Sequence, residues 1–123
     1  MLELTKENFE AEVLQAEGTI LVDFFGDGCV PCAALMPHVH AFAEKYGEDA
    51  DYWESVGILH DIDFEVAPDA HCTKCVEIFA AEKANYPQID DQLVHAVQSH
   101  GWSITVDVKP EHIMEKVLYT VDE

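Results

Sequence analysis

The sequence contains no arginine, and six lysines stand against 25 acidic residues. Arginine is the side chain most often used to bind phosphate and guanine. A net charge of −19 also repels polyanions, because such a chain gains nothing from counterion release. Anionic membrane surfaces are disfavoured on the same grounds. We therefore expect no nucleic-acid partner and no membrane partner.

Long apolar runs are absent as well. No run approaches the roughly 18 residues that a membrane-spanning helix needs, and the first residues, MLELTKE, are charged where a signal peptide would be apolar. A hydrophobic content of 49% is typical of globular proteins, and 123 residues suit one domain. These features predict a single cytoplasmic domain over residues 1–123, which we expect to be a monomer.

The first part of the chain has the pattern of an α/β fold. Residues 2–4 alternate as in a short strand, and residues 7–14 carry apolar side chains at helical spacing. Residues 19–25 form a nearly continuous apolar run that suits a central strand. A helix should follow from Val30, with Pro37 as a kink and Gly47 at its end. This order predicts a central mixed β-sheet flanked by helices.

The later part is less regular. Residues 55–63 predict a third strand, and a helix should begin at Pro68 and end before Pro87. Residues 90–100 fit either a helix or a strand over residues 93–97. Residues 102–108 alternate and are β-branched, which predicts another strand. Pro110 is typical of a first helical position and predicts the last helix.

The pair Cys29-Val-Pro-Cys32 lies where the predicted central strand meets the following helix. The helix N-terminus stabilises a thiolate there, so Cys29 is the expected nucleophile. Cys32, one turn further, is placed to attack a mixed disulfide and resolve it, and Pro31 stiffens the turn between them. Asp23, expected to be buried with a raised pKa, is placed to exchange a proton with Cys32.

A second pair, Cys72 and Cys75, occurs in the stretch HCTKC. It has three interpretations: inert helix thiols, a possible second dithiol, or metal ligands. Together with Cys29 and Cys32 it would make a four-thiolate zinc site, which defines an alternative function as a structural or interaction module. The redox interpretation predicts no metal ligand. The seven histidines contain no HxxxH pair with an acid between its members.

Several stretches together resemble the thioredoxin family. They are Leu4-Thr5-x-x-Asn8-Phe9, Leu21-Val22-Asp23-Phe24 and Cys29-x-Pro31-Cys32, followed by Leu35 and Pro37. The likeness covers about residues 1–49, and residues 108–118 resemble the family's final helix. The stretch GDGCVPC is similar to thioredoxins of amino-acid-fermenting anaerobes. The resemblance implies a thioredoxin-like α/β fold with an atypical second half.

The resemblance also implies a function, that of a dithiol–disulfide oxidoreductase that reduces protein disulfides and carries electrons. Cys29 would be the nucleophile, Cys32 the resolving thiol and Asp23 the buried acid. The Cys29–Cys32 disulfide would be the redox centre, with no other cofactor. The implied partners are protein disulfide substrates and an electron donor similar to thioredoxin reductase.

The substrate groove departs from the family pattern. Gly28 stands where the family usually has tryptophan, and no Ile-Pro-Thr with a cis proline occurs. Gly28 and Val30 are the groove residues expected beside the dithiol, and Pro87 is the best stand-in for the cis proline. Because residues 50–107 differ from the family, a redox-inactive binding protein on the same fold remains a further alternative.

Overall fold

The computed structural model describes the backbone of residues 2–17 and 30–122, and the side chains of residues 2–17 and 37–122. All regular structure in these ranges is helical. The elements are a short π-helix η1 (Glu10–Leu14), α1 (Val30–Tyr46), α2 (Ala50–Leu59), a 3-10 turn η2 (Pro68–Ala70), α3 (Lys74–Glu82), α4 (Asp91–Ser99) and α5 (Ile113–Val121).

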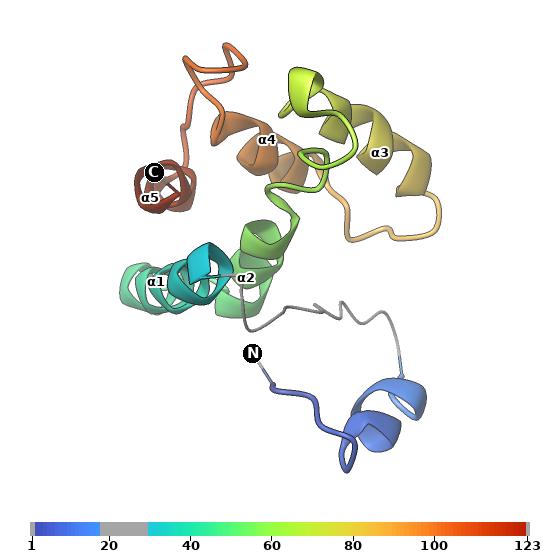
Figure 1. Cartoon of the computed structure of the whole chain (residues 1–123). Helices are drawn as coiled ribbons and strands as arrows, with labels where there is room; N and C mark the ends of the chain where they lie inside the picture. The colour runs from blue at the N-terminus through green and yellow to red at the C-terminus, as the bar shows by residue number, and fades with distance from the viewer. Residues whose placement is uncertain (1, 18–29, 123) are drawn as a thin grey trace.

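The five α-helices share one hydrophobic core. Helix α1 packs along α2 and against α5, while α3 packs on α4 (Figure 1). Segment 2–17, drawn in blue, lies apart from these helices in this view. Each α-helix contributes to the core, which consists of Val39, Ala43, Trp53, Val56, Cys75, Phe79, Leu93, Ala96, Val97, Met114, Val117 and Leu118.

The helix expected to begin at Val30 is confirmed as α1. Pro37 lies inside it, and Gly47 follows its last residue with φ of 71°. This left-handed conformation is one that glycine adopts without the steric cost of a Cβ, which explains why the helix ends there. Residues 19–25, the expected central strand, lie outside the described residues.

The strand predicted over residues 55–63 is wrong, because most of this segment belongs to α2. The helix begins at a side-chain cap: Asp49 accepts a hydrogen bond from the backbone N–H of Tyr52 at 3.1 Å. Trp53 and Val56, three residues apart, are both buried in the core. Helical spacing of the large apolar residues therefore prevails over the short β-branched run.

The strand predicted over residues 102–108 is also wrong. The carbonyl of Gly101 accepts hydrogen bonds from the backbone N–H groups of residues 104–106, which closes a turn. Ser103 has φ of 62°, and a single parallel bridge joins Trp102 to Val106. Residues 2–4 are not a strand either. The predicted mixed sheet thus has no strand within residues 2–17 and 30–122.

The structure resolves one segment that was predicted as either helix or strand, and it moves the start of two other helices. Within residues 90–100 the chain forms the helix α4 rather than a strand, and Asp90 caps it by accepting a hydrogen bond from the Leu93 N–H at 2.8 Å. The last helix begins at Ile113 rather than at Pro110, because His112 and Glu115 form a capping box there. The helix expected from Pro68 is interrupted after η2 and resumes at Lys74.

One contact between α1 and α2 makes stability depend on pH. His40 Nδ1 lies 2.5 Å from Oε1 of Glu54, and this hydrogen bond is the main cause that raises the pKa of His40 above 6.5. When folding raises the pKa of a histidine, the protonated side chain stabilises the folded state. This stabilisation is complete at a pH below the pKa in the unfolded chain, and it is lost as the pH rises through the pKa in the folded protein.

We expect the melting temperature of wild type to exceed that of His40→Gln most at about pH 6, with the gap shrinking toward about pH 9. The difference between the two proteins isolates this histidine, since other titrating groups are common to both. His38→Gln, an exposed change two residues away, is the matched control. A gap that stays constant or widens with pH would contradict the assignment.

Candidate functional site

The structure locates only part of the predicted dithiol site. Cys29, Asp23 and Gly28 lie outside the described residues. Val30, Pro31 and Cys32 are the first three residues of α1, and their side chains are likewise outside the described set. Cys29 directly precedes the first residue of α1, so the predicted helix start beside this cysteine is confirmed for the backbone.

Pro87 belongs to the link between α3 and α4, where its side chain is exposed. No cis peptide bond occurs in the described ranges, so the bond before Pro87 is trans. The expectation of a cis proline at this position is therefore wrong. A place for Pro87 in the substrate groove remains a prediction.

The second cysteine pair is divided between two environments. Both Cys72 and Cys75 are free thiols with fully buried side chains. Cys75 lies in the first turn of α3, where burial, followed by the charge of Asp63, raises its thiol pKa to about 12. It is therefore protonated and unreactive near neutral pH. Cys72 precedes the helix, contrary to the prediction, and has φ of 63°.

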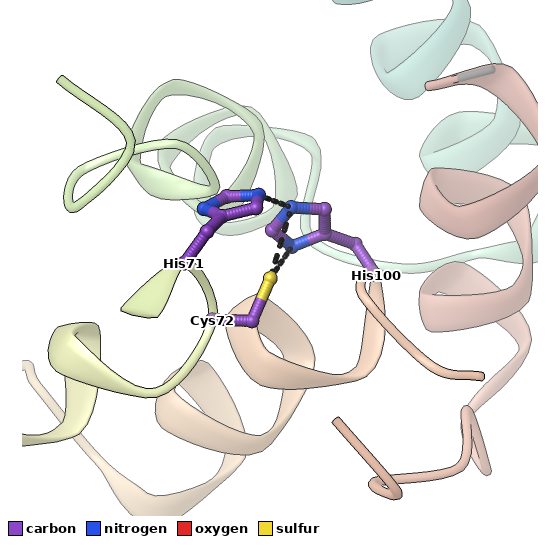
Figure 2. Close-up of side chains that lie close together, drawn as sticks. All are labelled: His71, Cys72 and His100. Atoms are coloured by element: carbon purple, nitrogen blue, oxygen red, sulfur yellow. Dashed lines mark hydrogen bonds between the residues drawn. The ribbon is translucent and has the colours of Figure 1, made fainter. Parts of the chain in front are cut away.

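Cys72 faces two histidines from distant parts of the chain. Figure 2 shows His71 and Cys72 from the turn before α3, and His100 from the end of α4, with their side chains pointing toward one another. Cys72 Sγ lies 3.5 Å from His100 Nε2, and His100 Nε2 lies 3.1 Å from His71 Nε2. One ligand atom from each residue lies within 4.8 Å of the others. Sulfur and imidazole nitrogen are ligands that bind transition metals.

Asp63 holds one side of this cluster in place. Its carboxylate is fully buried and accepts from His71 Nδ1 at 2.8 Å and from the backbone N–H of Cys75 at 2.7 Å. Burial opposes the charge of Asp63, but these hydrogen bonds outweigh it and lower its pKa below 3.8. A charged carboxylate at this point fixes the ring of His71 and the start of α3 together.

Asp61 lies beside both histidines. Its Oδ1 is 3.4 Å from His71 Nε2 and 3.6 Å from His100 Nε2. The hydrogen bond from His100 is the main cause that lowers the pKa of Asp61. Burial acts to lower the pKa of His100, but the contacts with Asp61 and Cys72 outweigh it and raise that pKa to about 10.

The other oxygen of Asp61 faces His60, which follows α2. His60 Nε2 lies 3.3 Å from Asp61 Oδ2 and 3.0 Å from Asp122 Oδ1, while its Nδ1 donates to the Gly57 carbonyl at 2.5 Å. Burial opposes a charge on His60, yet the two carboxylates raise its pKa above 6.5. A protonated His60 therefore orients Asp61, leaving Oδ1 toward the cluster.

Sequence reasoning did not anticipate this cluster. None of the three interpretations of Cys72 involved a histidine, and the histidines contain no HxxxH pair with an acid between its members. The signal that was present was the adjacent pair His71-Cys72 together with His100-Gly101, 28 residues after Cys72. Glycine at position 101 leaves room for the sulfur, since a Cβ there would collide with Cys72 Sγ and Thr105 Oγ1.

None of the helices in the described part of the chain is long and apolar enough to cross a membrane.

Comparison with known proteins adds an independent finding about the N-terminal part. The thioredoxin family model matches residues 1–79, past the residue-49 end of the sequence resemblance. A thioredoxin of Tissierella creatinophila is 68% identical over 44 residues, which are 36% of this chain and 100% of that relative. No solved structure matches the chain.

Two longer relatives are matched only in part. A thioredoxin of Peptoclostridium acidaminophilum is 61% identical over 46 residues, 37% of this chain and 42% of its own length. A thioredoxin of Acetoanaerobium sticklandii is 50% identical over 52 residues, 42% of this chain and 50% of its own length. The chain thus spans about half the length of these two relatives or less.

Proposed function

This chain belongs to the thioredoxin family, and on that premise we propose that it is a dithiol–disulfide oxidoreductase acting through Cys29 and Cys32. Family membership implies a thioredoxin fold and suggests thiol–disulfide exchange in general. The observation that carries the specific proposal is the Cys29-Val-Pro-Cys32 motif directly at the start of α1, inside the matched residues 1–79.

The proposed reaction has two steps. The Cys29 thiolate attacks one sulfur of a substrate disulfide, which forms a mixed disulfide and releases the other substrate sulfur as a thiolate that takes up a proton. The Cys32 thiolate then attacks Cys29 Sγ and releases the second substrate thiol. Two electrons pass to the substrate, and the protein is left with a Cys29–Cys32 disulfide.

The helix start supports these roles. Unpaired backbone N–H groups and the dipole of α1 favour a thiolate next to its N-terminus, and Cys32 follows within the first turn. Pro31 supplies no N–H and restrains the turn. Asp23 is proposed to exchange a proton with Cys32, and Gly28, Val30 and Pro87 to line the substrate groove.

The proposal extends to partners and place. Substrates are protein disulfides, and an electron donor similar to thioredoxin reductase returns Cys29 and Cys32 to the dithiol state. We propose a cytoplasmic monomer over residues 1–123, without nucleic-acid or membrane partners.

A trapping experiment tests the assignment of roles. Cys29 should alkylate faster than Cys32 near neutral pH, because its thiolate is stabilised. Cys32→Ser should accumulate a mixed disulfide with a reporter protein disulfide, and the double change Cys29→Ser, Cys32→Ser should not. Faster alkylation of Cys32, or equal trapping by both proteins, would overturn the proposal.

A further inference from the structure

His71 and His100 both use their Nδ1 atoms in hydrogen bonds to groups outside the cluster. Their Nε2 atoms therefore face each other. His71 Nδ1 donates to the carboxylate of Asp63, and His100 Nδ1 donates to the carbonyl of Val97. In its neutral form each ring then carries its lone pair on Nε2, and a second hydrogen occupies that nitrogen when the ring is protonated. These two Nε2 atoms face each other at 3.1 Å, so either a hydrogen on one of them or a metal ion bound to both must lie between them.

A sulfur atom and an oxygen atom also lie close to these two Nε2 atoms. Cys72 Sγ lies 3.5 Å from His100 Nε2, and Asp61 Oδ1 lies 3.4 Å from His71 Nε2 and 3.6 Å from His100 Nε2. Tetrahedral zinc with bonds of about 2.0–2.3 Å to nitrogen, oxygen and sulfur spaces neighbouring ligand atoms about 3.3–3.6 Å apart. The three spacings to sulfur and oxygen fall in this range, and the 3.1 Å between the two Nε2 atoms is slightly below it.

The backbone at Cys72 is held in an unfavourable conformation that serves this geometry. A φ of 63° is unfavourable for a residue with a Cβ, so the surrounding structure must impose it on Cys72. Gln98 Nε2 donates to the Cys72 carbonyl at 3.2 Å, and only glycine at position 101 leaves space for the sulfur. Two parts of the chain thus cooperate to direct Sγ toward His100.

We propose that His71 Nε2, Cys72 Sγ and His100 Nε2 bind a Zn²⁺ ion, with Asp61 Oδ1 as the fourth ligand. Imidazole and thiolate ligands select zinc over magnesium and calcium, which prefer oxygen. Asp63 and the Val97 carbonyl hold the two rings in the tautomer that binding needs. The Asp61 side chain is 51% exposed, so the ion can enter from that side.

This site is separate from the proposed exchange reaction and differs from the four-thiolate zinc site predicted from the sequence. It uses one cysteine, since the ligand atoms that lie within 4.8 Å of one another come from His71, Cys72 and His100, while the backbone N–H of Cys75 donates to Asp63. The competing explanation is a proton shared between the two imidazoles, which needs no metal at all.

Cobalt binding distinguishes the two explanations. The full chain carrying Cys29→Ser and Cys32→Ser removes the N-terminal thiols, so any cobalt–thiolate charge-transfer band must come from Cys72 or Cys75. After treatment with a chelator and titration with Co²⁺, we expect one equivalent to bind with a thiolate band, and one equivalent of Zn²⁺ to displace it.

Matched variants in that background assign the ligands. Cys72→Ala should abolish the band, while Cys75→Ala, an equally buried cysteine, should keep it. His100→Gln should weaken binding by at least about tenfold, while His95→Gln on the same helix should not. If circular dichroism shows that His100→Gln is unfolded, His71→Gln repeats the test, because the His71 side chain is less buried.

Absence of stoichiometric cobalt binding, a band that survives Cys72→Ala, or equal weakening by His100→Gln and His95→Gln would each overturn the zinc site. Reductase activity is measured separately on the parent chain with Cys29 and Cys32 intact. Failure of one proposal therefore leaves the other standing.

Discussion

Replacing Cys29 with serine is expected to abolish reduction of a protein disulfide. A hydroxyl near neutral pH is neither deprotonated nor able to form the mixed disulfide, so the first step of exchange is lost. We expect the rate to fall by about 10³-fold or more, to that of the chemical reductant alone. The measurement is dithiothreitol-driven reduction of a protein disulfide at limiting reductant.

The control for this experiment is Cys75→Ala. Cys75 is fully buried, and its pKa of about 12 keeps it protonated, so it cannot supply the attacking thiolate. We expect this variant to retain the parent rate. If Cys29→Ser keeps the parent rate, or if Cys75→Ala loses as much activity as Cys29→Ser, Cys29 is not the nucleophile.

Truncation of Trp53 to alanine is expected to cause the largest loss of stability in the described helices. The side chain is 2% exposed and stacks on His112 at 5.0 Å, which links α2 to the residue that caps α5. The Trp53 ring also makes an edge-to-face contact with the ring of Tyr52, and the two ring centroids lie 5.4 Å apart. Removing a buried tryptophan costs about 3–5 kcal/mol, because most of the cavity remains.

Since domains of this size are stable by only about 5–15 kcal/mol, Trp53→Ala should shift the urea midpoint strongly or unfold the helices outright. Trp102→Ala is the control: Trp102 is only half-buried and contacts Tyr119 at 5.8 Å. Trp53→Phe should show an intermediate midpoint by circular dichroism. A smaller effect for Trp53→Ala than for Trp102→Ala would contradict the central role of Trp53.

The two cysteine pairs illustrate how environment separates identical side chains. Cys29 and Cys32 flank a helix start, where backbone dipoles favour a thiolate. Cys75 also lies in the first turn of a helix, α3, yet burial and the neighbouring Asp63 keep it protonated. Cys72 instead faces two histidines. Spacing alone therefore does not assign a CxxC pair its chemistry.

Helices with a clear period or a local stop signal were predictable from the sequence. The apolar face after Val30 and the glycine at position 47 predicted α1, and both features are local. The CxxC motif was recognisable for the same reason, since its residues are adjacent in sequence. Family membership follows from such local stretches within residues 1–79.

The strands predicted after residue 50 were wrong because β-pairing depends on partners that a short pattern does not specify. Residues 55–63 are β-branched in places, but Trp53 and Val56 reach the common core only at helical spacing. Residues 102–108 alternate, yet they close a turn on the Gly101 carbonyl instead of pairing with a strand. Tertiary packing overrode local preference in both segments.

The sequence by itself determined the helix before Gly47, the CxxC motif at its start and the family of the chain, because these depend on neighbouring residues. Only the tertiary structure placed Asp61, His71 and Cys72 beside His100. The packing of α3 on α4 brings these residues close to His100, and no periodic pattern in the sequence predicts that packing. Convergence of ligands from separate segments is a property of packing, since it requires the loop before α3 and the end of α4 to meet.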